Sequence, residues 1–232
     1  MGRPTHYSTE IAKRCQRLIE RFAHQVECDQ ALSQEFRGPL RTTFLLAMST
    51  PMVVLPIERL YKPGSGQQGV ADDVPLDAAV GDRVRATLNQ KPFGATPFFR
   101  AGDWAYVEGT PAFPVAGTWP AEVFDELDRP EAMEAAASAE AKDIVGCLRN
   151  ALSHGGVAYL DHRGRQSDDA TGMLGFASHP STRRTTELRL LRIAVDRYQS
   201  FLHLWTEWLI DSGVETALTH QGPGWFADAE LA

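Results

Sequence analysis

Several common features are missing from this sequence of 232 residues, and each absence narrows the class of protein. It has three cysteines, Cys15, Cys28 and Cys147, and they form no CxxC pair. Three cysteines cannot all pair within one chain, which excludes the disulfide framework of a small secreted domain. The first ten residues lack the apolar stretch of a secretory signal peptide. We therefore expect a protein of the reducing cytoplasm.

Long hydrophobic runs are also missing. The longest uncharged apolar run, Thr42 to Ile57, is shorter than the ~20 residues that span a bilayer, and it contains Pro51 and Pro56. We predict a buried segment here and no membrane partner. With 43% hydrophobic residues, a chain of this length can bury a sizeable core, so we expect a single domain over residues 1–232.

Signatures of the commonest cofactor and metal sites are absent as well. There is no GxxxxGK[ST] loop, no HExxH motif, and no glycine-rich turn that follows a strand and opens a helix. The neighbouring carboxylates of Asp168 and Asp169 fit a polar loop better than a metal site. We predict no metal and no cofactor.

Charge is unevenly distributed along the chain, whose formal net charge is -7. Residues 72–140 carry 13 acidic and 5 basic side chains, whereas residues 149–200 carry 8 basic and 5 acidic ones. A locally basic groove can bind a few phosphates even on an acidic protein. Four arginines of the basic half are candidate RNA contacts, with solvated surface charges as the alternative: Arg163, Arg165, Arg183 and Arg184.

Hydrophobic periodicity predicts a mainly α fold, an antiparallel helical bundle with a small β-hairpin and an irregular insertion at about residues 63–119. Gly38-Pro39 separates the first two helices, and the second is bent at its prolines. The expected helices are Thr9–Phe36, Leu40–Tyr61, Leu76–Leu88, Pro120–Leu127, Ala132–His154 and Leu188–Leu209. A flexible loop is expected over Lys62–Gly69, a hairpin over Val157–Asp161 and Met173–Ala177, and a strand over Trp104–Val107.

Two apolar patterns carry further predictions. The last helix has a 3-4-3-4 seam, which predicts packing against an antiparallel helix or a partner subunit. Its members are Leu188, Leu191, Val195, Tyr198, Leu202, Trp205 and Leu209. The aromatic residues of the insertion fit packing against the bundle better than a ligand or partner surface. They are Phe93, Phe98, Phe99, Trp104, Tyr106, Phe113 and Trp119.

The candidate site lies in residues 148–156, where Arg149 precedes His154 by five positions and Gly155-Gly156 must end a helix. Arginine binds phosphate with a planar fork, and histidine titrates near neutral pH. Asn150 adds a hydrogen-bonding group, and the glycines leave the histidine accessible. The alternative is that the helix dipole favours a histidine in a last turn without any catalytic role.

The spacing by itself is not specific. Arg17 with His24 and Arg197 with His203 match a looser version of it, but both pairs lie within regular helical patterns and are predicted to be structural or surface residues. Residues five apart are separated by about 140° around an α-helix, so Arg149 and His154 cannot share one face. Either the last turn is distorted, or the site is built across a dimer.

The string Arg-Asn-Ala-Leu-Ser-His-Gly at 149–155 resembles the helix end of a bacterial group of the HEPN superfamily, and residues 52–59 resemble the second helix of that group. The resemblance covers about residues 8–62 and 120–212. It implies a homodimer with two motif-bearing helix ends in one cleft and metal-independent endoribonuclease activity that leaves a 2′,3′-cyclic phosphate. In it His154 is the acid/base, Arg149 steadies the phosphate, and Asn150 is the polar neighbour.

The resemblance further implies a cytoplasmic toxin or defence effector with an antitoxin or regulatory protein as a partner. Some toxins of the superfamily carry a tyrosine two residues after the histidine, which a partner enzyme modifies. Gly156 stands there in this chain, so that regulation is not expected. The alternative function is a catalytically inactive HEPN-like binding or assembly module, in which the same residues stabilise a helix end and a dimer.

Overall fold

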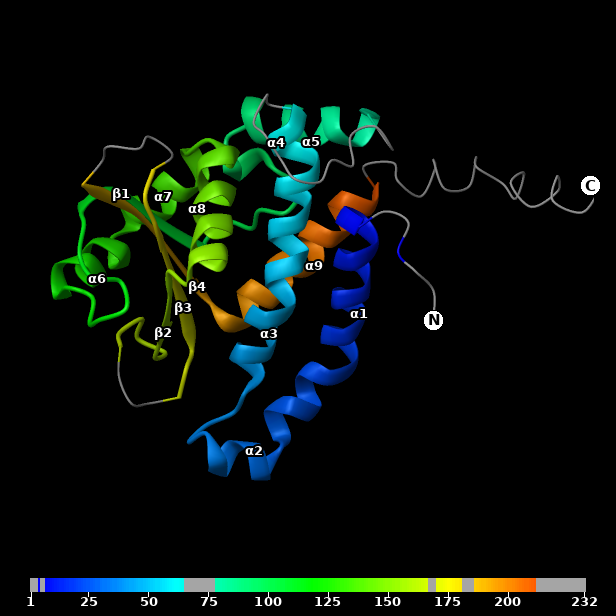
Figure 1. Cartoon of the computed structure of the whole chain (residues 1–232). Coiled ribbons are helices and arrows are strands. Elements are labelled where there is room, and N and C mark those ends of the chain that lie inside the picture. The colour runs from blue at the N-terminus through cyan, green and yellow to red at the C-terminus, as the bar shows by residue number, and fades with distance from the viewer. Residues whose placement is uncertain (1–3, 5–6, 65–77, 167–169, 181–185, 212–232) are drawn as a thin grey trace, which may run out of the picture.

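Helices and a small sheet form separate layers in this protein (Figure 1). The computed structural model describes residues 4, 7–64, 78–166, 170–180 and 186–211. The helices are α1 (Tyr7–Cys28), α2 (Gln30–Glu35), α3 (Arg41–Ser49), α4 (Lys62–Gly64), α5 (Ala78–Gln90), α6 (Ala121–Asp128), α7 (Pro130–Ser138), α8 (Ala141–His154) and α9 (Val195–Leu209). The strands are β1 (Trp104–Pro111), β2 (Val157–Leu160), β3 (Met173–Ser178) and β4 (Glu187–Ala194).

The four strands make one antiparallel sheet in the order β1-β4-β3-β2. Most of the remaining elements are helices, so the predicted mainly α fold is confirmed. Side chains alternate between its two faces. One face, with Trp104, Phe176 and Leu191, lies in the main core with α8 and α9. The other face, with Leu160 and Leu190, packs against α6 in a second apolar cluster. The predicted hairpin is confirmed as β2 and β3, but it is half of a larger sheet.

The prediction of one helix over Leu188–Leu209 is wrong in its first third, which is β4. This strand lies between β1 and β3 and is buried on both faces. A strand buried on both sides is apolar at consecutive positions, so its residues also satisfy a helical period. The seam is confirmed in α9, where Tyr198, Leu202 and Trp205 are fully buried.

Two other expected helices are each divided in two. Thr9–Phe36 breaks at Asp29, whose carboxylate caps α2 by accepting the Leu32 N–H at 3.0 Å. Ala132–His154 breaks where Ala139 and Glu140 adopt extended conformations between α7 and α8. The stop at Gly38-Pro39 is confirmed. In the predicted loop, Lys62–Gly64 is helical, and residues 65–69 lie outside the described ranges.

Helical structure continues beyond α3 through two π-helical segments, Thr50–Val54 and Ile57–Tyr61. Pro56 has no N–H, so it cannot donate the bond that an α-helix would direct to the Met52 carbonyl. The indole N–H of Trp205 donates to that carbonyl at 2.9 Å, which ties α9 to the bend.

By length and composition alone, Arg41–Tyr61 could cross a membrane, with a mean hydropathy of 1.3. In this fold 39% of that apolar window is buried, and the segment packs against α1 and α8. The predicted buried segment is therefore buried on one side, against α1 and α8, and partly exposed on the other, and the absence of a membrane partner stays a prediction.

The segment expected as an insertion is part of the fold, because it supplies α5 and the edge strand β1. Its aromatic rings pack as predicted. Phe98 makes edge contacts with Trp205 and Trp208 of α9 at ring-centroid distances of 5.0 and 4.9 Å, and Trp119 is 1% exposed in the second cluster.

Arg192 of β4 joins the sheet to the end of α6. Its side chain is 9% exposed, donates to the Leu127 carbonyl at 2.9 Å and pairs with Asp128 at 2.7 Å. Arg165 pairs with the other oxygen of Asp128, also at 2.7 Å. Burial raises the pKa of Asp128, but the hydrogen bonds from both arginines outweigh it and hold that pKa below its usual value.

We expect Asp128→Asn to lower the free energy of unfolding at pH 7 by about 1 kcal/mol, because solvent screens a carboxylate that is 44% exposed. The folded-state pKa of Asp128 is lowered, so its stabilisation is present above the unfolded-state value of about 3.9 and is lost as the pH falls through the folded-state value. Urea unfolding at pH 7, 5 and 3 checks this. A difference from the wild type that stays constant with pH would contradict it, and Glu122→Gln is the exposed control.

Candidate functional site

The end of α8 is fixed in place by its two glycines. Gly155 adopts a left-handed conformation with φ 74°, and the Gly156 N–H donates to the Ala151 carbonyl at 2.9 Å. Gly156 also accepts the Ala177 N–H of β3 at 2.8 Å, and a Cβ at position 156 would collide with the Ala177 carbonyl oxygen. The predicted helix stop is confirmed, and the sheet holds it.

His154 is the last residue of α8 and is exposed to solvent. Among the residues that the structure describes, its ring makes no hydrogen bond and no ion pair. The favourable position at the negative end of the helix dipole remains. The imidazole is therefore available to a ligand or to a second protein chain.

Arg149 lies one and a half turns earlier and is largely buried, with a side chain that is 16% exposed. Its guanidinium donates to the Asn150 side-chain oxygen at 2.5 Å and forms an ion pair with Glu58 of the second π-helical segment. Burial lowers the pKa of Arg149, and its Nε is buried without a partner among the described residues. Glu58 also pairs with Lys62 at 2.8 Å.

Glu58 lies within residues 52–59 and was not predicted to be a site residue. The available signal was a lone carboxylate that follows a long apolar run. Such a group is expensive to bury unless a cation pairs with it. Which cation would pair with it could not be read from the sequence, because Arg149 lies 91 positions further along the chain.

One chain does not bring Arg149 and His154 together. The helix α8 is α-helical up to His154, so the explanation by a distorted last turn is wrong. The two side chains therefore leave the helix about 140° apart. The other explanation, a site built across two subunits, stays a prediction.

The exposed side of α8 and the neighbouring helix form what we call the motif face. The first π-helical segment packs against α8, and α3 lies beside it (Figure 1). On α8 and on the helical segment from α3 to Glu58, the residues of this face recur three or four positions apart and are partly or fully exposed. Those on the segment from α3 to Glu58 are mostly apolar. The motif face comprises Ala47, Pro51, Val54, Leu55 and Glu58 together with Gly146, Arg149, Asn150 and Ser153.

Only two of the four candidate RNA-contacting arginines lie in the described residues, so the structure does not test whether the four form one surface. Arg163 is exposed in the turn after β2, at the opposite end of that strand from His154. The guanidinium of Arg165 pairs with Asp125 and Asp128 of α6 and lies 5.2 Å from the centre of the Phe124 ring, so its role as an RNA contact stays a prediction. Arg183 and Arg184 lie outside the described residues.

The two looser arginine-histidine pairs are surface features, as predicted. Arg17 pairs with Glu20 at 2.8 Å within α1, and Arg197 lies 3.6 Å from Asp103. His203 contacts Glu207 one turn later at 3.3 Å, and His24 is 87% exposed. Arg17, Glu20, His203 and Glu207 line a shallow hollow of about 350 Å³, and Asp103 and Arg197 line another of about 310 Å³.

The fold and the site define a mainly helical domain with a four-stranded antiparallel sheet and an exposed histidine at a glycine-ended helix terminus. The chain matches no family model, no curated protein and no solved structure. Within the described ranges, no three His, Cys, Asp or Glu side chains gather so that they could hold a metal ion, and Asp168 and Asp169 lie outside those ranges. Because no similar protein was found, the function has to be inferred from the residues at the end of α8.

Proposed function

We propose that this protein is a HEPN-like, metal-independent endoribonuclease that acts as a homodimer. The single observation that carries the proposal is the arrangement at the end of α8. An exposed imidazole, without a partner in the described part of the chain, and a largely buried arginine leave the same regular helix on different faces. Each side chain suits a step of RNA cleavage, and a dimer would bring the two steps together in one site.

His154 would act on the ribose. A neutral imidazole takes the proton of the 2′-OH near neutral pH, and the 2′-oxygen then attacks the adjacent phosphorus. The new bond joins the 2′-oxygen to phosphorus, the bond to the 5′-oxygen breaks, and that oxygen takes a proton from water. The products are a 2′,3′-cyclic phosphate and a 5′-OH. Exposure of His154 is what this step requires.

Arg149 would hold the phosphate. Its planar fork stabilises the charge that accumulates on the phosphoryl oxygens, and Asn150 fixes one arm of the fork. Glu58 occupies the other arm. Because Glu58 also pairs with Lys62, a phosphate could replace it on Arg149 and leave the carboxylate with a cation.

The motif face would be the dimer interface. Its partly exposed apolar residues, among them Pro51, Val54 and Leu55, adjoin Glu58 and the α8 motif. A twofold axis through this face would bring the motif of each chain near that of the other. Apolar side chains that are only half buried and lie beside the Arg149 motif favour this surface.

A cleavage assay tests the activity itself. Purified protein is incubated with several structured and unstructured RNAs in EDTA, and the product ends are identified. Cleavage with 2′,3′-cyclic phosphate ends is expected. Absence of cleavage on all substrates would contradict the proposal. We further propose a role as a toxin or defence effector with an antitoxin or regulatory partner, which the resemblance alone supports.

A second candidate function is a catalytically inactive HEPN-like binding or assembly module. The observation that favours it is the ion pair of Arg149 with Glu58, which ties α8 to the adjacent π-helical segment. An arginine in that role contributes to stability whether or not RNA is cleaved. To distinguish the two functions, a variant must keep the positive charge of residue 149 and remove the planar guanidinium.

We expect Arg149→Lys to reduce cleavage about 100-fold, because a lysine keeps the charge but loses the fork that binds two phosphate oxygens. Its free energy of unfolding should fall by less than about 1 kcal/mol, since the substituted ammonium group can still pair with Glu58. Arg149→Ala should cost about 2 kcal/mol in urea unfolding because Glu58 loses a partner. Unchanged cleavage in the lysine variant would favour the inactive module, and Arg197→Lys is the exposed control.

A further inference from the structure

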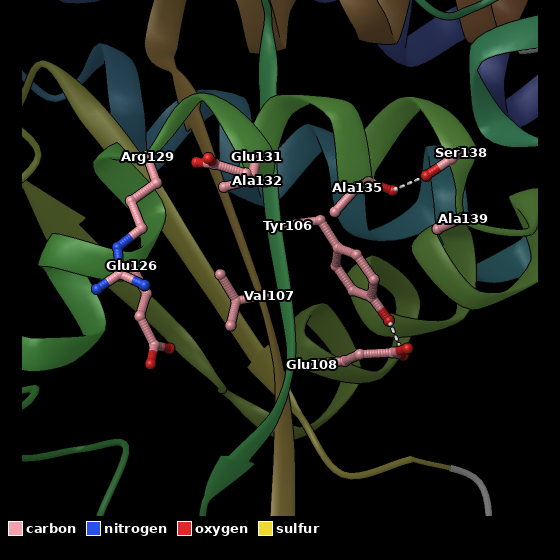
Figure 2. Close-up of a pocket in the computed structure, with 10 residues that line it drawn as sticks. All are labelled: Tyr106, Val107, Glu108, Glu126, Arg129, Glu131, Ala132, Ala135, Ser138 and Ala139. Carbon is pink, nitrogen blue, oxygen red and sulfur yellow. Dashed lines mark hydrogen bonds between the residues drawn. The ribbon is translucent and has the colours of Figure 1, made fainter.

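The two edges of the sheet differ in what covers them. At one edge α7 packs against β1, whose residues Trp104, Ala105 and Tyr106 are buried (Figure 2). At the other edge, among the described helices and strands, only β3 runs alongside β2. Tyr159 of β2 is 43% exposed. The outer edge of β2 is therefore open.

This edge presents backbone groups that have no partner. The carbonyls of Gly156 and Leu160 point toward β3, because each accepts an N–H from that side at 2.8 Å. Backbone groups alternate between the two sides of an antiparallel strand, so the N–H and C=O groups of Val157 and Tyr159 point away from β3. No hydrogen bond joins these outward groups to any other described residue.

The features that keep an edge strand from pairing are missing from β2. Proteins protect such strands with charged side chains, prolines, bulges or a covering element. Residues 155–160 read Gly-Gly-Val-Ala-Tyr-Leu, with no charge and no proline, and β2 pairs with β3 without a register shift. Its outward N–H and C=O groups are a template for one more extended segment.

The charge at the two ends of this edge selects the occupant. His154 lies just before β2, and His162 and Arg163 follow it. All three side chains are exposed, and none makes a hydrogen bond or ion pair within the described residues. Asp161 is partly buried, and its carboxylate accepts the backbone N–H groups of Arg163 and Arg165. A segment with acidic side chains at its ends is complementary to these groups.

Other occupants fit the edge less well. An antiparallel pair of two β2 strands would place Arg163 of one chain beside His154 of the other, and like charges so placed destabilise strand pairing. A polynucleotide would meet the cationic groups, but its backbone has no N–H donors for the outward carbonyls of Val157 and Tyr159. An acidic polypeptide satisfies both the charges and the backbone.

We propose that the open edge of β2 binds an extended segment of a partner protein that is acidic at its ends. The segment adds a fifth strand to the sheet through main-chain hydrogen bonds with Val157 and Tyr159. Its carboxylates meet the basic groups at the two ends of β2. This binding does not depend on RNA cleavage, and it is measured without RNA.

A synthetic peptide with a valine-threonine-valine centre and two glutamates at each end tests the proposal on the full chain. Its seven residues span about 23 Å, so the glutamates reach past the four residues of β2 in either direction. Fluorescence anisotropy of the labelled peptide should show saturable binding, and NMR should show amide shifts centred on Val157 and Tyr159. Arg163→Gln should weaken binding about threefold. Arg100→Gln, at an exposed arginine before β1, should leave it unchanged.

A pair of variants at Tyr159 separates the backbone from the side chain. Tyr159→Pro removes an outward N–H that no described residue uses, and proline is tolerated at such positions of an edge strand. It should weaken binding at least about tenfold while circular dichroism and thermal unfolding show the native fold. Tyr159→Thr keeps the N–H and removes the ring, so it should bind within about threefold of the wild type.

Modified peptides make the same test without changing the protein. N-methylation of alternate residues blocks the N–H groups on one edge of the peptide, so one of the two possible methylated peptides should lose at least about tenfold in affinity. The proposal is overturned if the parent peptide does not bind at millimolar concentration, or if a peptide with lysines in place of the glutamates binds as well. Undiminished binding by a folded Tyr159→Pro chain would also overturn it. Self-association that Tyr159→Pro abolishes, without peptide binding, would assign the edge to a second copy instead.

Discussion

His154→Ala should reduce RNA cleavage by at least about 10³-fold, because it removes the group that takes the 2′-OH proton. The fold should be unaffected, since His154 is exposed and makes no hydrogen bond with the described part of the chain. The measurement is the initial rate of cleavage in EDTA, with circular dichroism and thermal unfolding to confirm the native fold. His24→Ala, at an exposed histidine of α1, is the matched control.

A mixing experiment identifies which chain supplies each side chain. If one site combines Arg149 of one subunit with His154 of the other, a dimer of one Arg149→Lys chain and one His154→Ala chain keeps one intact site. A 1:1 mixture that exchanges subunits should then recover about one quarter of the wild-type activity, since half of the dimers are mixed and each has one of two sites.

Failure of that recovery has a distinct meaning. If each site used Arg149 and His154 of the same chain, every site in the mixture would carry one substitution and activity would stay near zero. The regular α8 helix makes this outcome the unexpected one, because it separates the two side chains around the helix axis. A monomeric protein in sedimentation velocity would contradict the dimer directly.

Gly156→Ala should lower the free energy of unfolding by about 3 kcal/mol, because the new Cβ would collide with the Ala177 carbonyl oxygen, a backbone atom that cannot move aside alone. For a domain of this size the melting temperature should fall by roughly 6–12 °C. The same displacement would move the end of α8 relative to β3, so cleavage should also fall.

Gly146→Ala is the matched control in the same helix. Nothing lies within 4 Å of a Cβ at that position, and alanine is the better helix former. We expect its stability to rise by about 0.5–1 kcal/mol. If Gly156→Ala were as stable as the wild type in urea unfolding, the close contact of Gly156 with the Ala177 carbonyl could not be what fixes the end of α8.

The local elements of this protein were largely predictable from sequence. The apolar stripes of α1 and α6, the hairpin, and the glycine stop after His154 depend on neighbouring residues and were predicted with small errors at their ends. The break at Asp29 between α1 and α2 was not predicted, because the apolar stripe continues past this residue and only the side chain of Asp29 signals a new helix start. The nuclease activity, the homodimer and the partners stay proposals.

The sequence by itself determined the exposed position of His154, the end of its helix, and the presence of Arg149 and Asn150 beside it. Tertiary structure alone decided that residues 187–194 are a strand, because pairing on both sides and burial on both faces override a helical period. It also decided that Glu58 holds Arg149 and that α7 packs against the edge strand β1. These features join residues far apart in the chain, and no local pattern records which distant groups will meet.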